Sequence, residues 1–134
     1  MKNGSRHLKF KKIKKGKINK YRFKSKLNFG FIGLKTLQSG ILNTKQIESL
    51  KKTIKKITKN KLKFWFKTAI LLPISSKSIG TRMGKGKGKI SHFVTRIKAG
   101  TILIELSGSN KKLLIKSLLV CKLKLSVKTC ICLK

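Results

Sequence analysis

Residues 80–89 read GTRMGKGKGK, so three glycines alternate with three lysines shortly after an arginine. Glycine lets a backbone approach a surface closely and adopt positive φ angles, and lysine adds a positive charge on a flexible stem. A segment of this composition repels itself and cannot form a core. We therefore expect it to lie against a dense polyanion such as a nucleic-acid backbone. A flexible linker is the alternative interpretation, but linkers usually combine glycine with serine.

The charge balance of the whole chain also indicates an anionic partner. The chain has 36 lysines and arginines against 2 aspartates and glutamates, a net charge of +34 over 134 residues. A free domain with this charge would be destabilised by self-repulsion. We therefore expect a permanent complex that neutralises it, with polyphosphate as the first candidate and an anionic membrane surface as the second. Because 40% of the residues are hydrophobic, a folded domain with a modest core is expected.

Several classes of protein are disfavoured. The longest apolar run, Ala69 to Leu72, is far too short for a membrane-spanning helix, which needs about 20 residues. The N-terminus has no apolar signal core. The three cysteines, Cys121, Cys130 and Cys132, are odd in number and clustered, which argues against a disulfide framework. We interpret them as small apolar side chains rather than metal ligands, because a zinc site usually has four ligands in paired spacings.

The sequence also offers little for catalysis. Its two carboxylates, Glu48 and Glu105, are explained by structural roles, and acid–base catalysis needs titratable groups held close together. His7 and His92 have no local carboxylate to orient them, which disfavours a catalytic triad. The glycine-lysine loop, which we define as residues 80–90, lacks the spacing of a P-loop or a dinucleotide fingerprint. We therefore predict that the chain is not an enzyme and holds neither a cofactor nor a metal.

The chain divides into a basic arm at residues 1–26 and a single α+β domain at residues 27–134. In the arm, closely spaced lysines alternate with aromatic and aliphatic residues. A disordered solubilising tail is one interpretation. The interleaved aromatics favour an arm that binds nucleic acid and becomes ordered on binding.

The first half of the domain is predicted to form a strand, a helix and a second strand, in that order. Alternating apolar residues predict the first strand at 27–35. Asn43 is a good helix N-cap with Gln46 three residues later, and an apolar stripe follows at Ile47, Leu50, Ile54 and Ile57. The second strand is expected at 62–68, with Leu62, Phe64 and Phe66 in the core. Trp65 either packs in a second layer or stacks on a base, and packing is the more common role.

The second half predicts a hairpin, a helix and a last strand. The hairpin joins residues 93–98 to 101–107 through Ala99-Gly100, with Ile102, Ile104 and Leu106 on one face. Glu105 should point to the opposite face and pair with a lysine or arginine. Ser109 or Asn110 should cap the second helix, and the last strand should run through residues 125–131. This order predicts an α+β fold, with two helices packed on a mostly antiparallel sheet.

Several segments resemble a known family. Arg82-Met83-Gly84-Lys85-Gly86-Lys87-Gly88 is similar to the Arg-Met-Gly-Lys-Gly-Lys-Gly segment of the large-subunit ribosomal protein L-sixteen family, in its bacterial and organellar form. Residues 29–35 resemble the family's Phe-Gly-x-x-Gly-Leu-Lys segment, and residues 98–105 resemble its Lys-Pro-Gly-x-x-Leu-x-Glu hairpin. These segments occur in the family's order, and the resemblance extends through most of the chain.

The resemblance implies a structural protein of the large ribosomal subunit with an α/β hammerhead-like fold. Such a protein binds large-subunit rRNA, approaches tRNA near the peptidyl-transferase centre, touches neighbouring ribosomal proteins and supports subunit assembly. Peptide-bond chemistry would belong to the RNA. The residues expected to contact rRNA or tRNA are Arg82, Met83, Gly84, Lys85, Gly86, Lys87, Gly88, Lys89, Lys9, Lys11, Lys12, Lys14, Lys15 and Lys35.

Composition adds an expectation about the source of the chain. Only four of its 36 basic residues are arginine, while lysine, isoleucine and asparagine are abundant, a bias typical of an AT-rich organellar genome. Together with the lack of a transit-peptide pattern, this favours a mitochondrial ribosome first and a plastid ribosome second. We expect neither membrane insertion nor a homo-oligomer. The alternative functions are a cationic protein of the membrane surface and a DNA-compacting protein.

Overall fold

The computed structural model describes residues 12–14, 16–18, 24–84 and 86–134. Within these ranges the chain forms seven strands and two helices, in an order that mixes both types. The helices α1 (Thr44–Thr58) and α2 (Lys111–Leu123) pack against each other. All strand pairs are antiparallel. The predicted α+β class is therefore confirmed, although the strands form two sheets rather than one.

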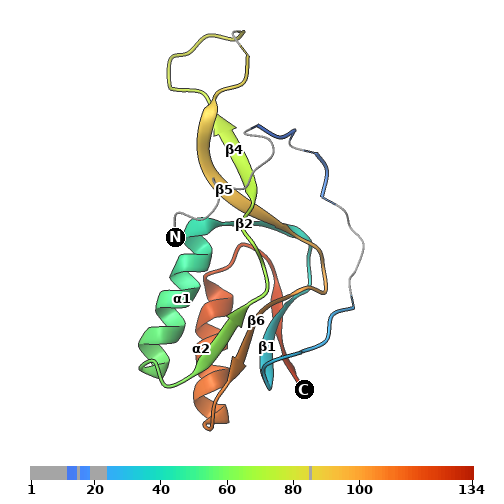
Figure 1. Cartoon of the computed structure of the whole chain (residues 1–134), viewed down its shortest axis with the longest axis vertical. Coiled ribbons are helices and arrows are strands. Elements are labelled where there is room, and N and C mark those ends of the chain that lie inside the picture. Colours follow the sequence, from blue (N-terminus) through green and yellow to red (C-terminus); the bar gives the residue numbers. More distant parts are fainter. Residues whose placement is uncertain (1–11, 15, 19–23, 85) are drawn as a thin grey trace.

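The larger sheet has four strands in the order β3 (Lys63–Phe66), β6 (Ile102–Ser107), β1 (Ile32–Thr36) and β7 (Thr129–Leu133). The smaller sheet has the order β2 (Gly40–Asn43), β5 (Lys89–Ile97) and β4 (Leu72–Ser76). Figure 1 shows the helices and the larger sheet forming the body of the molecule, with β4 and β5 extending away from it. The smaller sheet thus carries a projection that the body supports.

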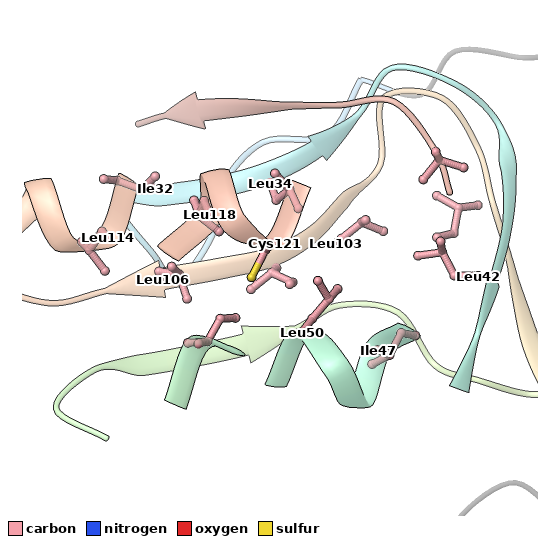
Figure 2. Packing of buried hydrophobic residues seen from close by; sticks show 14 residues of the cluster. Ile32, Leu34, Leu42, Ile47, Leu50, Leu103, Leu106, Leu114, Leu118 and Cys121 are labelled. Atoms are coloured by element: carbon pink, nitrogen blue, oxygen red, sulfur yellow. The ribbon is translucent and has the colours of Figure 1, made fainter. Parts of the chain in front are cut away.

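The core lies between the two helices and the larger sheet. Apolar side chains from α1, α2, β1 and β6 meet there, and many of them are fully buried (Figure 2). Leu42 of β2 and Ile97 of β5 join the same cluster, so the two sheets share one apolar interior. Cys121 is buried within it as a small side chain, as we predicted. Burial raises the pKa of the Cys121 thiol to about 11, against the opposing effect of the Lys124 charge.

Both predicted helices and their caps are confirmed. The backbone N–H of Asn43 donates to Gln46 Oε1 at 2.9 Å, which is one half of a capping box. In α2, Asn110 rather than Ser109 is the cap, since its Oδ1 accepts from Leu113 N at 3.2 Å. The stripe of α1 is buried at Ile47, Leu50 and Ile54 and half-buried at Ile57, which follows the expected helical spacing.

The predicted hairpin between residues 93–98 and 101–107 is wrong. Its two strands, β5 and β6, follow each other along the chain but belong to different sheets. Thr36 holds the connection between them: its O accepts from Gly100 N, and its hydroxyl donates towards Lys98 O. The alternation of apolar residues predicted β6 to within a residue, but it predicted only the second half of β5, which begins at Lys89. It did not reveal that β5 pairs with β2 and β4 while β6 pairs with β1 and β3.

One expected core face is also shifted. Leu34 pairs with Ile104, but the next residue, Lys35, pairs with Ile102, so β6 carries an extra residue. Such a bulge re-aims the side chains beyond it. Leu103 therefore joins Ile104 and Leu106 in the main core, whereas Ile102, although buried, is absent from that cluster.

The first strand begins at Ile32 rather than at residue 27, because the preceding backbone has another partner. The N–H groups of Asn28, Phe29 and Gly30 all donate to the Glu105 carboxylate, at 2.7–3.2 Å. Gly30 approaches β6 so closely that a Cβ would lie 2.6 Å from Leu106 O. Any larger residue at this position would collide with the backbone of β6.

Glu105 is the one carboxylate of the larger sheet, and it is fully buried. The predicted basic partner is Lys67, whose Nζ lies 2.5 Å from Glu105 Oε1. Burial alone would raise the pKa of Glu105, but the hydrogen bonds from Lys67 and from the three backbone N–H groups together lower it to about 2. Glu105 is therefore ionised at neutral pH, and its carboxylate holds the segment before β1 against the sheet.

Trp65 and Phe29 cover this anchor from outside the core. Their rings stack with centroids 5.9 Å apart and an angle of 28° between the planes. Lys67 Nζ lies 5.8 Å from the centroid of the Phe29 ring. Trp65 therefore packs against another side chain, which agrees with the more common of its two predicted roles. Phe29 is nevertheless 63% exposed, so the pair forms part of the surface.

The ends of two further elements differ from the sequence analysis. No strand was predicted at residues 72–76, which contain Pro73, yet they form the edge strand β4, where proline is tolerated. The last strand begins at Thr129 rather than at 125, because Lys124 N and Leu125 N still donate to carbonyls at the end of α2.

Candidate nucleic-acid interface

The glycine-lysine loop connects β4 to β5 and forms the far end of the molecule (Figure 1). The two strands remain paired as far as Ser76 and Lys89. Just beyond this pair, a Cβ on Gly88 would lie 2.3 Å from Ser76 O. Only glycine at this position therefore lets the strands β4 and β5 approach each other so closely at the base of the loop.

Beyond this base, the described side chains of the loop are almost wholly exposed. Met83 is 98% exposed, and Ile79 beside the loop is 106% exposed. Gly84 and Gly86 have φ angles of 101° and 74°, and a Cβ on either would meet nothing within 4 Å. The loop therefore presents backbone and positive charge to its surroundings, and the described residues of its tip pack on no part of the body.

The structure places six of the predicted loop residues on this exposed segment: Arg82, Met83, Gly84, Gly86, Lys87 and Lys89. Gly88 is half-buried at the base. Lys85 lies outside the described residues. A few contacts shape the loop, including a hydrogen bond of 2.6 Å from Lys77 Nζ to Gly84 O.

Part of the basic arm lies against the loop. Lys12 Nζ donates to Lys87 O at 2.7 Å, and Lys87 Nζ donates to Ile13 O. Residues more than 70 positions apart in the chain are thus brought together. An ammonium has three N–H donors, so each lysine retains donors for an anion after one bond to a carbonyl.

The other predicted contacts are distributed differently. Lys14 lies beside the loop's sheet, where its O accepts from Arg96 Nη2 at 3.5 Å. Lys35 lies on β1 of the larger sheet, half-buried, and is not brought to the loop. Lys9, Lys11 and Lys15 fall outside the described residues. The structure therefore unites Lys12 and Lys14 with the loop and separates Lys35 from it.

Arg96 is a basic residue of this region that our sequence interpretation missed. It lies on β5, and the arm passes close by it, since a Cβ on Gly16 would lie 3.1 Å from Arg96 Nη1. Arg96 is one of only four arginines in the chain. That rarity on a predicted strand was the one available signal, and it did not reveal the contact with the arm.

Among the described residues, no group of three or more histidines, cysteines, aspartates or glutamates is positioned to hold a metal. His92 is exposed, and its Nδ1 lies 3.2 Å from Ser91 Oγ. Within the described ranges, neither helix is long and apolar enough to cross a membrane.

Comparison with known proteins identifies the family. The sequence pattern of the family described as ribosomal protein L16p/L10e matches residues 4–132. The chain belongs to this family. The match covers the arm, both sheets and the glycine-lysine loop, which agrees with the resemblance drawn from the motifs.

Several family members are similar over nearly their full length. The large ribosomal subunit protein uL16 of Buchnera aphidicola subsp. Cinara cedri is 36% identical over 132 residues, covering 90% of this chain and 97% of the relative. The uL16 protein of Psychrobacter cryohalolentis is 39% identical over 124 residues, covering 92% of this chain and 90% of the relative. That of Orientia tsutsugamushi strain Boryong is 36% identical over 122 residues, covering 90% of each chain.

Membership in the L16p/L10e family makes the chain a structural ribosomal protein with a role in translation. The relatives named above come from bacteria, so they support a bacterial-type protein and leave the predicted mitochondrial origin as a prediction. The family also gives the projecting loop a setting, because a ribosome is rich in the polyanion that such a loop requires.

Proposed function

We propose that this chain is a structural constituent of the large ribosomal subunit that binds large-subunit rRNA and approaches tRNA near the peptidyl-transferase centre. It carries no catalytic activity of its own. One observation supports this most strongly: an exposed loop of glycines and cations projects from a well-packed body, with part of the basic arm beside it. A surface of this kind suits a phosphate backbone, since glycine allows close approach and lysine supplies charge.

The rRNA contact involves the loop and the arm together. Arg82, Lys87 and Lys89 belong to the loop or its base, and Lys12 and Lys14 lie beside it. The arm and the loop are joined by hydrogen bonds between Lys12 and Lys87 and between Lys87 and Ile13. We propose that residues 1–26 act as an rRNA-binding arm and that residues 27–134 act as one domain. Lys9, Lys11, Lys15 and Lys85 extend the contact, and Lys35 makes a separate one on the larger sheet.

The tRNA contact belongs to the outer part of the loop. Its projection beyond the body (Figure 1) allows it to reach past the rRNA that the arm and the base of the loop contact. The positive φ angles of Gly84 and Gly86 turn the backbone without side chains that would hold an RNA away. This arrangement positions substrate RNA and performs no chemistry.

We further propose that the ribosome in question is organellar, with the mitochondrion as the first choice and the plastid as the second. The support is compositional, since lysine outnumbers arginine 32 to 4 within the 36 basic residues. Within the subunit the chain acts as a single copy bound to rRNA and neighbouring proteins.

The test is a binding measurement with the full chain and a labelled large-subunit rRNA fragment. Neutralising about six to ten phosphates should lower the affinity roughly 10³- to 10⁵-fold between 50 and 200 mM salt. Structured rRNA should compete better than duplex DNA of equal length and better than vesicles of anionic lipid. Binding without a salt dependence would contradict the proposal. A preference for duplex DNA or for vesicles would favour a DNA-compacting or membrane-surface protein instead.

A further inference from the structure

A second basic surface lies on the body, between the two helices and away from the loop. A groove of about 390 Å³ separates α1 from the end of α2. Its lining consists of side chains from α1 and the residue that follows α2: Lys45, Glu48, Ser49, Lys52, Thr53, Lys56 and Lys124. Four lysines therefore face one glutamate, together with two hydroxyl groups.

Helical geometry explains why α1 contributes so many of these groups. Lys45, Ser49, Lys52 and Lys56 are spaced three or four residues apart, so they share one side of the helix. The apolar stripe of α1, with Leu50 at 1% and Ile54 at 0% exposure, faces the core instead. The lysines of the groove are therefore not needed to form the body.

Lys124 comes from a different element and is held in place. Its Nζ donates to Thr53 Oγ1 at 2.6 Å, and Thr53 Oγ1 donates in turn to Ser49 O at 2.8 Å. Thr53 is only 6% exposed. A lysine that merely keeps a surface soluble needs no such support. The cation of this exposed side chain is thus oriented in advance along the lining of an open groove, which lowers the entropic cost of binding an anion.

The one carboxylate of the groove limits where an anion fits. Glu48 lies a full turn before Lys52 on α1, towards the start of the helix. An anion is favoured towards the other end, where Lys52 and Lys56 line the groove together with Lys124, which is bound to the Thr53 hydroxyl. One singly charged carboxylate against four ammonium groups leaves the groove strongly positive.

We propose that this α1–α2 groove binds phosphate groups of the rRNA backbone, as a site separate from the glycine-lysine loop. This inference rests on the proposed function, and it adds a contact on the rigid body to the contact on the projection. Two contacts on different faces fix the orientation of the body on the RNA. The loop is then held in a defined direction rather than swinging about its base.

The binding test compares three variants of the full chain on the same large-subunit rRNA fragment. Lys52→Ala/Lys56→Ala/Lys124→Ala removes the groove cations. Lys111→Ala/Lys112→Ala/Lys116→Ala removes the same charge from exposed positions of α2 outside the groove. Each lost phosphate contact should lower the slope of log K against log salt by about 0.7 to 0.9. The magnitude of the slope should therefore fall by about 2 to 3 in the groove variant. It should fall clearly less in the α2 variant.

A loop variant, Lys87→Ala/Lys89→Ala, separates this inference from the proposed function. If the groove and α2 variants have equal slopes while the loop variant is weakened, the groove site is wrong and the rRNA-binding function stands. If none of the three variants changes the slope, the proposed function fails as well. Lys52→Ala/Lys56→Ala serves as a second groove variant that keeps the Lys124–Thr53 hydrogen bond intact.

Lysine acylation of the assembled large subunit identifies what covers the groove. Lys52, Lys56 and Lys124 should be protected in the intact subunit and become reactive after nuclease digestion of the RNA. Protection that survives nuclease would assign the groove to an acidic protein neighbour and overturn the inference. Full reactivity in the intact subunit would also overturn it.

Discussion

The body and the glycine-lysine loop of this protein have similar densities of lysine but opposite physical states. In the body, apolar residues recur at helical or strand spacing, and side chains such as Leu34 and Leu118 are completely buried. In the loop, glycine takes every second position from 84 to 88, and Met83 is 98% exposed. The body is therefore stabilised by its own interior, whereas the loop depends on what lies against it. Lysine content alone does not predict whether a segment is packed or exposed. The residues between the lysines, apolar in the body and glycine in the loop, determine this.

The largest expected effect is on the stability of the body. Ile54→Ala should lower the free energy of unfolding by about 2 to 5 kcal/mol, because it leaves a cavity among fully buried neighbours. Denaturant unfolding measures the loss, with Met83→Ala as the matched control in the loop. Equal destabilisation by both substitutions would remove the distinction between the two regions.

A smaller effect is expected from the buried carboxylate. Glu105→Gln should lower stability by about 1 to 3 kcal/mol, because Lys67 loses its charged partner and the N–H groups of residues 28–30 lose a strong acceptor. Hydrogen exchange should also show that residues 28–31 open more readily. Unchanged exchange there would mean that Glu105 does not anchor this segment.

The same group predicts a pH dependence of the body. The pKa of Glu105 is lowered from 4.5 to about 2 in the folded state. Its contribution to stability is therefore fully present above about pH 4.5 and is lost as the pH falls towards 2. Unfolding followed between pH 6 and 2 should show this loss in the wild type and a shallower one in Glu105→Gln. Parallel pH profiles would contradict the assignment.

The smallest effect on stability is expected in the loop. Lys87→Ala/Lys89→Ala should change the free energy of unfolding by no more than about 0.5 kcal/mol, as for other exposed positions. The same variant should weaken rRNA binding and impair tRNA-dependent translation by ribosomes that carry it. Destabilisation as large as that of Ile54→Ala would show that the loop belongs to the folded core.

The sequence predicted the local features well. Asn43 with Gln46 and the stripe through Ile54 follow from short-range spacing, and the loop motif indicated the family. Charge predicted a basic partner for Glu105, but only the structure identified it as Lys67 of the neighbouring chain segment. The sequence was a poor guide to which strands pair with each other. An alternating strand such as β5 carries no mark that tells whether β6, β2 or β4 lies beside it, because pairing depends on the whole sheet.

The same limit applies to the surfaces. The contact between Lys12 and Lys87 joins residues 75 positions apart, and that between Lys124 and Thr53 joins residues 71 positions apart. Such pairs become visible only when the elements that carry them are packed. Single motifs therefore revealed the loop, but the cationic groove, which is assembled from two helices, required the structure.

A density map of the large ribosomal subunit that contains this chain, resolved to individual side chains, tests the central claim most directly. The account predicts that residues 82–89 lie against nucleic acid, with backbone and lysine N–H groups within hydrogen-bond distance of phosphate oxygens. A map in which this segment faces bulk solvent, or packs only on protein, would contradict it.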